Sequence, residues 1–126
     1  MKIVLVVEDY TPLFRAVNEK FLRFGITAVQ VVSYDEATKY LVEHAENIGL
    51  VWLDHYLIGE KTGLDVLAFM KDKNNMKDIP VLAVSNESNH DRMKQYKALG
   101  AKEYYIKVGN RLAEIAEEAK KLLSVE

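Results

Sequence analysis

Polar residues follow several short apolar runs of this chain, each at the point where the run ends. They are an acidic pair, a lone aspartate, a serine and a lysine: Glu8 with Asp9, then Asp54, Ser85 and Lys107. If the apolar runs form parallel strands of one sheet, their carboxyl ends meet at one edge and bring these side chains together. Carboxylates crowded at that edge repel one another, and a hard cation such as Mg²⁺, which prefers oxygen ligands, relieves the repulsion. The sequence therefore predicts a magnesium site there.

A hydroxyl and an ammonium group opposite the cation would complete a site for an anionic phosphoryl group. Ser85 would supply a hydrogen bond and Lys107 a positive charge. Phosphoryl transfer depends mainly on in-line positioning and charge neutralisation, and this set of residues offers both. Taken singly, each position has an ordinary structural interpretation, such as a solvated loop acid, a helix cap or a surface lysine. Their combination is what favours a functional site.

The apolar runs alternate with helical patterns along the chain. Continuous apolar runs, typical of strands buried on both faces, predict strands at residues 3–7, 26–32, 50–53, 81–84 and 104–106. The predicted helices are one opened by Thr11 as N-cap and Pro12 and ended by Gly25, one capped by Ser33 with Glu36, and three at residues 64–71, 91–99 and 111–123. This order predicts one α/β domain over residues 1–126, with a parallel sheet, helices on both faces and right-handed crossovers.

Composition argues against several classes of function. The 126 residues carry a net charge of −2, with lysine and arginine spread along the chain, which disfavours a nucleic-acid surface. No apolar run approaches membrane-spanning length, and the apolar start is too short for a signal peptide core. Because the chain has no cysteine, disulfides and thiol chemistry are excluded, which is consistent with a reducing compartment.

Over essentially its whole length, the sequence resembles the receiver domain of two-component response regulators. The matching segments, in the family's order and spacing, are residues 6–9, 51–54, 80–85 and 100–107. The resemblance implies a flavodoxin-like, doubly wound sheet of five parallel strands in the order 2-1-3-4-5, with five helices on both faces. It also implies a cytoplasmic module that takes a phosphoryl group from a sensor histidine kinase, a phosphotransfer protein or a small acyl phosphate. Such a module catalyses its own phosphorylation and dephosphorylation without being a conventional turnover enzyme.

The resemblance also implies a role for each acidic residue at the strand ends. Asp54 is the nucleophile that becomes an aspartyl phosphate, and its carboxylate is a ligand of Mg²⁺ as well. Asp9 is a direct Mg²⁺ ligand, whereas Glu8 acts largely through a bound water. The backbone carbonyl of Tyr56 is a further ligand.

The remaining site residues are implied to hold the phosphoryl group and to report its presence. Ser85 and Lys107 contact the phosphoryl oxygens, and Ser85 and Tyr104 turn inward together when the aspartate is phosphorylated. This remodels the face made by the fourth helix, fifth strand and fifth helix, through which the domain would bind a downstream protein target or form a homodimer. Tyr104 and Tyr105 are adjacent in a strand and must face opposite sides, so a core position for Tyr104 is the alternative to a switch.

The sequence departs from the usual pattern of the family at three places. The loop at residues 55–63 lacks the usual proline and is one residue longer. Asn86 replaces a small residue and would narrow access to the phosphorylation site. Val108 follows Lys107 in place of proline. Since a non-proline cis bond costs about 2.5–4 kcal/mol, we expect a trans Lys107–Val108 bond, with the chain turning at Gly109.

Two other functions would use the same residues differently. One is an interaction domain of the same fold that is never phosphorylated, although nothing structural requires the full acidic set together with Lys107. The other is a phosphatase with an aspartate nucleophile, which needs a second acid two residues later, where this chain has Tyr56. His55 is not expected to serve as a phosphohistidine beside Asp54, because neighbouring strand residues face opposite ways.

Overall fold

The computed structural model, which describes residues 2–86, 89–107 and 111–123, contains the predicted parallel sheet. Its strands are β1 (Ile3–Val7), β2 (Ala28–Val31), β3 (Ile48–Leu53), β4 (Val81–Ser85) and β5 (Glu103–Ile106). All neighbouring strands are parallel, in the order β2-β1-β3-β4-β5. This is the flavodoxin-like order that the resemblance implied. The expected trans Lys107–Val108 bond and the turn at Gly109 lie outside the described residues.

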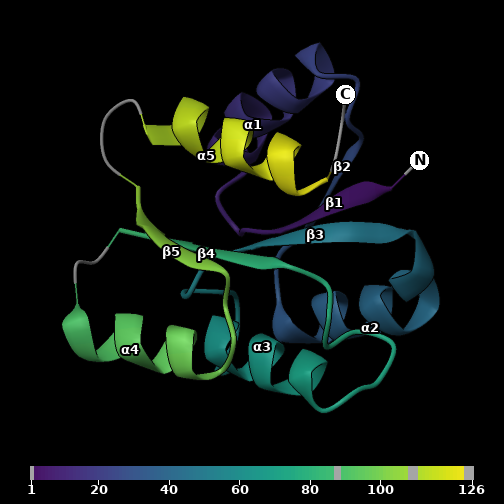
Figure 1. Ribbon diagram of the computed structural model, residues 1–126. Helices are drawn as coiled ribbons and strands as arrows, with labels where there is room; N and C mark the ends of the chain where they lie inside the picture. Colours follow the sequence, from purple (N-terminus) through teal and green to yellow (C-terminus); the bar gives the residue numbers. More distant parts are fainter. Residues whose placement is uncertain (1, 87–88, 108–110, 124–126) are drawn as a thin grey trace.

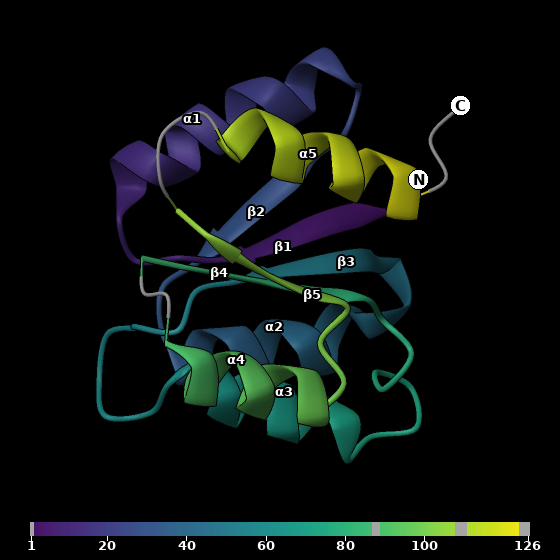
Figure 2. The same ribbon diagram turned by 60° about the vertical axis from the view of Figure 1, so that its left-hand side comes forward.

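Helices cover both faces of the sheet. They are α1 (Thr11–Arg23), α2 (Tyr34–His44), α3 (Gly63–Lys71), α4 (His90–Ala98) and α5 (Arg111–Leu122), with a short 3₁₀ turn η1 (Ala45–Asn47) after α2. α1 and α5 lie together on one face, and α2, α3 and α4 lie on the other (Figure 1, Figure 2). No helix in the described part of the chain combines the length and apolar content that crossing a bilayer requires.

The sheet separates two apolar cores. Successive residues of a strand face opposite ways, so Val4 and Val6 pack with α1 and α5, whereas Leu5 and Val7 pack with α2, α3 and α4. All of these side chains are fully buried. Burial on both faces explains why the inner strands are continuous apolar runs rather than alternating ones. Trp52 of β3 lies on the α1 and α5 side, in the same core as Val6.

Several element boundaries differ from the sequence prediction by one or two residues, and hydrogen bonds explain the differences at α1 and β2. α1 begins at Thr11 itself with Tyr10 as its extended N-cap residue, so the prediction that Thr11 is the N-cap is wrong. The Thr11 hydroxyl instead accepts a hydrogen bond from the Gln30 side chain at 3.3 Å. β2 begins two residues later than predicted, at residue 28. The reason is that the Ile26 N–H donates back to the Phe21 carbonyl at the end of α1, at 2.9 Å.

The cap predicted for α2 is confirmed, with one partner changed. The Ser33 hydroxyl accepts a hydrogen bond from the Glu36 N–H at 3.1 Å. The Glu36 carboxylate accepts from the Val32 N–H at 3.0 Å, rather than from the N–H of the cap residue itself. The loop after β3 is fastened at the same place, because the Ile58 N–H donates to the Val32 carbonyl at 3.1 Å.

The amino edge of the sheet brings the two ends of the described chain together around Gly49. A Cβ atom on Gly49 would lie 2.5 Å from a methyl group of Leu123 and 2.7 Å from the Cβ atom of Lys2. A larger residue at this position would therefore have to displace the Leu123 side chain and Lys2.

Candidate functional site

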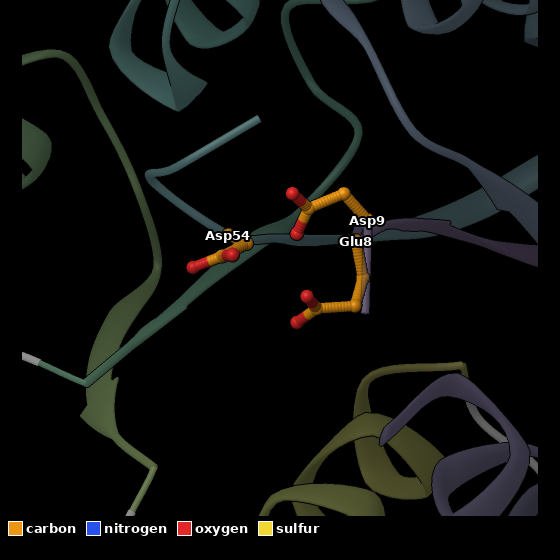
Figure 3. A group of neighbouring side chains, drawn as sticks. All are labelled: Glu8, Asp9 and Asp54. Atoms are coloured by element: carbon orange, nitrogen blue, oxygen red, sulfur yellow. The ribbon is translucent and has the colours of Figure 1, made fainter. Parts of the chain in front are cut away.

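Three carboxylates converge at the carboxyl edge of the sheet (Figure 3): those of Glu8, Asp9 and Asp54. One oxygen of each lies within 4.8 Å of the others. Glu8 and Asp54 are 1 % and 5 % exposed, whereas Asp9 is open to solvent. Every donor is a hard oxygen atom, so the cluster fits a small divalent cation such as Mg²⁺.

Backbone pairing that continues past the strands places these acids. The Glu8 N–H donates to the Val31 carbonyl of β2 at 2.9 Å. The Asp54 N–H donates to the Val7 carbonyl of β1 at 3.0 Å. The parallel ladder therefore extends one residue beyond the strand ends and holds both acids beside each other. The predicted meeting of the strand ends is confirmed for these residues.

Lys107 brings a positive charge to the same place. Its Nζ atom lies 2.5 Å from Glu8 Oε1 and 3.3 Å from Asp54 Oδ2. Its backbone N–H donates to the Ser85 carbonyl at 2.8 Å, which continues the pairing of β4 with β5. One ammonium group against three carboxylates leaves an excess of negative charge, and a divalent cation would neutralise that excess.

The environment of Asp54 shifts its protonation strongly. Burial, together with repulsion by Glu8, raises the pKa of this carboxyl from 3.8 to about 6. Attraction to Lys107 and the hydrogen bond from the His55 N–H lower the pKa but do not reverse the effect. A bound cation would favour the carboxylate form, because it supplies the opposite charge that burial withholds.

A cavity of about 330 Å³ opens in front of the acidic groups. Its lining consists of Glu8, Asp9, Tyr10, Leu13, Asp54, Tyr56, Asn86 and Lys107. This volume holds a phosphoryl group together with a cation and several waters, since a water occupies about 30 Å³ of liquid. Asn86, one of the departures from the family pattern, is part of the wall, as expected.

Ser85 and Tyr104 are absent from the residues that line the cavity. Ser85 is 1 % exposed, and its hydroxyl has no hydrogen-bond partner among the described residues. A buried hydroxyl without a partner is unfavourable, so a ligand oxygen or water within reach of Ser85 would stabilise it. Tyr104 is 7 % exposed and faces the core under α4, whereas Tyr105 packs with the α1 and α5 core. The predicted opposite orientation of the two tyrosines is confirmed.

Sequence reasoning missed a buried polar pair directly behind Asp54. The ring of His55 turns to the α4 side, as the alternation of strand residues predicted, and its Nδ1 atom shares a hydrogen bond of 2.9 Å with the Tyr96 hydroxyl. His55 is 6 % exposed, and Tyr96 is fully buried. The feature of the sequence that could have indicated this pair is Tyr96 itself, a bulky aromatic residue in a helix that is otherwise strongly polar.

Tyr56 links the mouth of the cavity to α4. Its hydroxyl accepts a hydrogen bond from the Arg92 guanidinium at 3.2 Å, and that guanidinium lies 5.3 Å from the centre of the Tyr56 ring. Tyr56 remains 49 % exposed, so one side of its ring faces solvent while it borders the cavity. The aromatic residue thus forms part of the wall of the cavity in front of Asp54.

Comparisons with known proteins agree with this geometry. A family model for the response regulator receiver domain matches residues 4–119. The chain is 29 % identical over 104 residues to the two-component response regulator ORR3 of Oryza sativa subsp. indica, covering 82 % of this chain and 78 % of that protein.

Solved structures of similar proteins cover nearly the whole chain. The phosphorylated cyanobacterial phytochrome response regulator RcpA is 27 % identical, with a TM-score of 0.86 over 98 % of this chain and 94 % of that one. The Mn²⁺-bound form of the response regulator Rcp1 is 25 % identical, with a TM-score of 0.82 over 96 % and 93 %.

Proposed function

Because the chain belongs to the response regulator receiver domain family of two-component signalling, we propose that Asp54 is its phosphoacceptor. The observation that carries the proposal is the convergence of Glu8, Asp9 and Lys107 on the Asp54 carboxylate in a single cavity. A cation site and a fixed ammonium group beside a buried carboxylate supply the positioning and charge neutralisation that phosphoryl transfer requires.

In the proposed reaction, a carboxylate oxygen of Asp54 attacks the phosphorus atom of a phosphohistidine on a sensor kinase or phosphotransfer protein. The new P–O bond forms as the P–N bond breaks, and the histidine nitrogen keeps the electron pair and takes up a proton. With a small acyl phosphate as donor, a P–O bond breaks instead and a carboxylate leaves. Dephosphorylation is the attack of water on the same phosphorus atom, which returns Asp54 and inorganic phosphate.

The surrounding residues would bind Mg²⁺ and contact the phosphoryl oxygens. Asp9, Asp54 and the Tyr56 carbonyl would hold Mg²⁺, with Glu8 acting largely through a water, and the cation when bound would neutralise the phosphoryl oxygens. Lys107 already lies beside Asp54 Oδ2 and would pair with a phosphoryl oxygen. The buried Ser85 hydroxyl would donate to another oxygen.

Two similar proteins support these assignments by the states in which they were solved. RcpA was solved phosphorylated and Rcp1 with Mn²⁺ bound. We extend both properties, a phosphorylated state and a divalent cation, to this chain by proposal. Transmission to a downstream protein, or to a second copy, would use the face of α4, β5 and α5, with Ser85 and Tyr104 as its switch residues. We also propose that a sensor histidine kinase or a phosphotransfer protein is the donor of the phosphoryl group, and that the protein acts in the cytoplasm.

The direct test is treatment with acetyl phosphate and Mg²⁺, followed by intact mass measurement. We expect the wild type to gain one phosphoryl group, and Asp54→Asn to gain none. Asp35→Asn, which removes an exposed acid from the first turn of α2, is the matched control and should behave as the wild type. A wild type that gains no mass would favour an interaction domain that is never phosphorylated. Equal gain in Asp54→Asn would move the acceptor to another residue.

A further inference from the structure

Three hydrogen bonds hold His55, and one of them is made to the proposed phosphoacceptor itself. Its backbone N–H donates to Asp54 Oδ1 at 2.8 Å, so it orients the carboxylate directly. Its carbonyl accepts from the Gly63 N–H at 2.9 Å, which fixes the far end of the loop. Its ring shares the 2.9 Å hydrogen bond with Tyr96 of α4. Of these three, the ring bond is the one that ties the segment to α4.

Tyr96 sits where several elements meet. The ring of Tyr96 lies 5.8 Å from that of His55, nearly perpendicular at 77°, and 5.6 Å from that of Tyr104 in β5. A Cβ atom on Gly63 would lie 2.5 Å from the Tyr96 hydroxyl oxygen, so the glycine leaves the space that this hydroxyl occupies. The start of α3, the body of α4 and the end of β3 are therefore fitted around one hydroxyl group.

The reacting carboxylate and the side chains that hold its backbone lie on opposite faces of the sheet. The carboxylate of Asp54 faces the cavity, whereas the His55 ring points into the opposite core, behind the acceptor. If the His55 ring lost its hydrogen bond to Tyr96, the peptide between Asp54 and His55 would be held less firmly. The N–H that donates to Asp54 Oδ1 belongs to that peptide. The same peptide leads into Tyr56, the residue whose carbonyl is the proposed cation ligand. A loss at Tyr96 would thus reach the site through the backbone of residues 54–56.

We propose that His55 and Tyr96 form a positioning pair for phosphoryl transfer at Asp54. Neither side chain touches the reacting atoms. Their hydrogen bond holds the backbone after β3 in the geometry that presents the carboxylate, and it anchors that backbone to α4. The inference rests on the proposed function of Asp54 as phosphoacceptor.

The test compares rates of phosphorylation by acetyl phosphate at a fixed Mg²⁺ concentration, with intact mass as the readout. We expect Tyr96→Phe and His55→Leu each to slow the rate about fivefold, the factor that one net hydrogen bond represents. The double variant should be no slower than either single one, because both remove the same bond. His55→Asn, whose amide can replace the Nδ1 atom, should recover most of the rate.

Tyr40→Phe is the matched control, because it removes a hydroxyl from a second tyrosine–histidine pair. The Tyr40 ring lies 4.4 Å from that of His44 on α2, and neither lines the cavity. The rate of phosphorylation of Tyr40→Phe should equal the wild-type rate. Urea unfolding of every variant gives the folded fraction, to which each rate is normalised, so a purely structural loss is removed from the comparison.

The outcomes separate the inference from the proposed function. If the wild type is phosphorylated and Tyr96→Phe keeps its rate, the pair has no positioning role. The inference also fails if His55→Asn is as slow as His55→Leu, or if the two single losses multiply in the double variant. If the wild type takes no phosphoryl group, the proposed function fails, and the positioning role fails with it.

Discussion

Asp54→Asn should stabilise this protein at neutral pH in the absence of divalent cations. The pKa of Asp54 is raised from 3.8 to about 6 by burial and by Glu8. Between these values the folded protein holds a proton on Asp54 that the unfolded chain has released. The stabilising contribution of that proton is therefore fully present below pH 3.8 and is lost as the pH rises through about 6. Above this window, the wild type folds with an unfavourable buried charge that asparagine does not carry.

The size of the effect follows from the shift. A rise from 3.8 to about 6 corresponds to about 3 kcal/mol at 1.36 kcal/mol for each pKa unit. Asp54 is 5 % exposed, so screening by solvent takes little from this figure. At pH 8 without Mg²⁺, the free energy of unfolding of Asp54→Asn should thus be about 3 kcal/mol larger than that of the wild type. At pH 4 the two proteins should differ little, because Asp54 is then largely neutral in the folded protein.

Urea unfolding followed by circular dichroism in EDTA, from pH 4 to pH 8, measures this difference. Other groups titrate in both proteins, so the difference between the two curves isolates Asp54. Asp35→Asn, on the exposed start of α2, should show no such trend. Mg²⁺ at ten times its Kd should return about 1.4 kcal/mol to the wild type and much less to Asp54→Asn. An Asp54→Asn protein that is less stable at pH 8, or a difference that ignores pH, would refute the reasoning.

Three further predictions test individual contacts. Asp9→Ala should remove more of the Mg²⁺-induced rise in Tm than Glu8→Ala, because Glu8 is proposed to act through water; equal losses in thermal melts would contradict this. Tyr56→Ala should speed the loss of the phosphoryl group once the donor is removed, because the ring that borders the cavity no longer limits water; an unchanged decay rate would count against it. Gly63→Ala should destabilise the fold by about 1–3 kcal/mol, since the added methyl would lie against the Asp54 carbonyl and the Tyr96 hydroxyl. Urea unfolding measures this loss, and a wild-type free energy would show that the contact relaxes without strain.

The strand ends were predictable because each carries two independent signals. A continuous apolar run marks the strand, and the polar residue after it marks the edge; Asp54 and Lys107 both fit this pattern. Parallel pairing of the strands then brings such residues together at one edge, independently of how the helices pack. The expected sheet order rested on the family resemblance, and the pairing of β1 with both β2 and β3 confirms it.

What escaped prediction depends on contacts between distant side chains. The His55–Tyr96 bond joins residues 41 positions apart, and nothing in the local sequence of either one specifies the other. The raised pKa of Asp54 likewise arises from burial and from the neighbouring Glu8, which only the folded arrangement creates. The late start of β2 has a different, local origin, because a backbone bond from Ile26 to the end of α1 competes with the sheet.

The meeting of the chain ends around Gly49 determines where the molecule tolerates a covalent attachment. Lys2 and Leu123 lie at the amino edge of the sheet, and the acidic cavity lies beyond its carboxyl edge. An affinity tag, a surface tether or a fused reporter joined at either end would therefore leave the cavity free. Because Lys2 and Leu123 are neighbours, a short peptide could also link the chain near these residues, and new ends could be opened in the exposed segment at residues 74–75. Circular permutants of this kind would change the order of the strands along the chain while keeping the carboxyl edge intact.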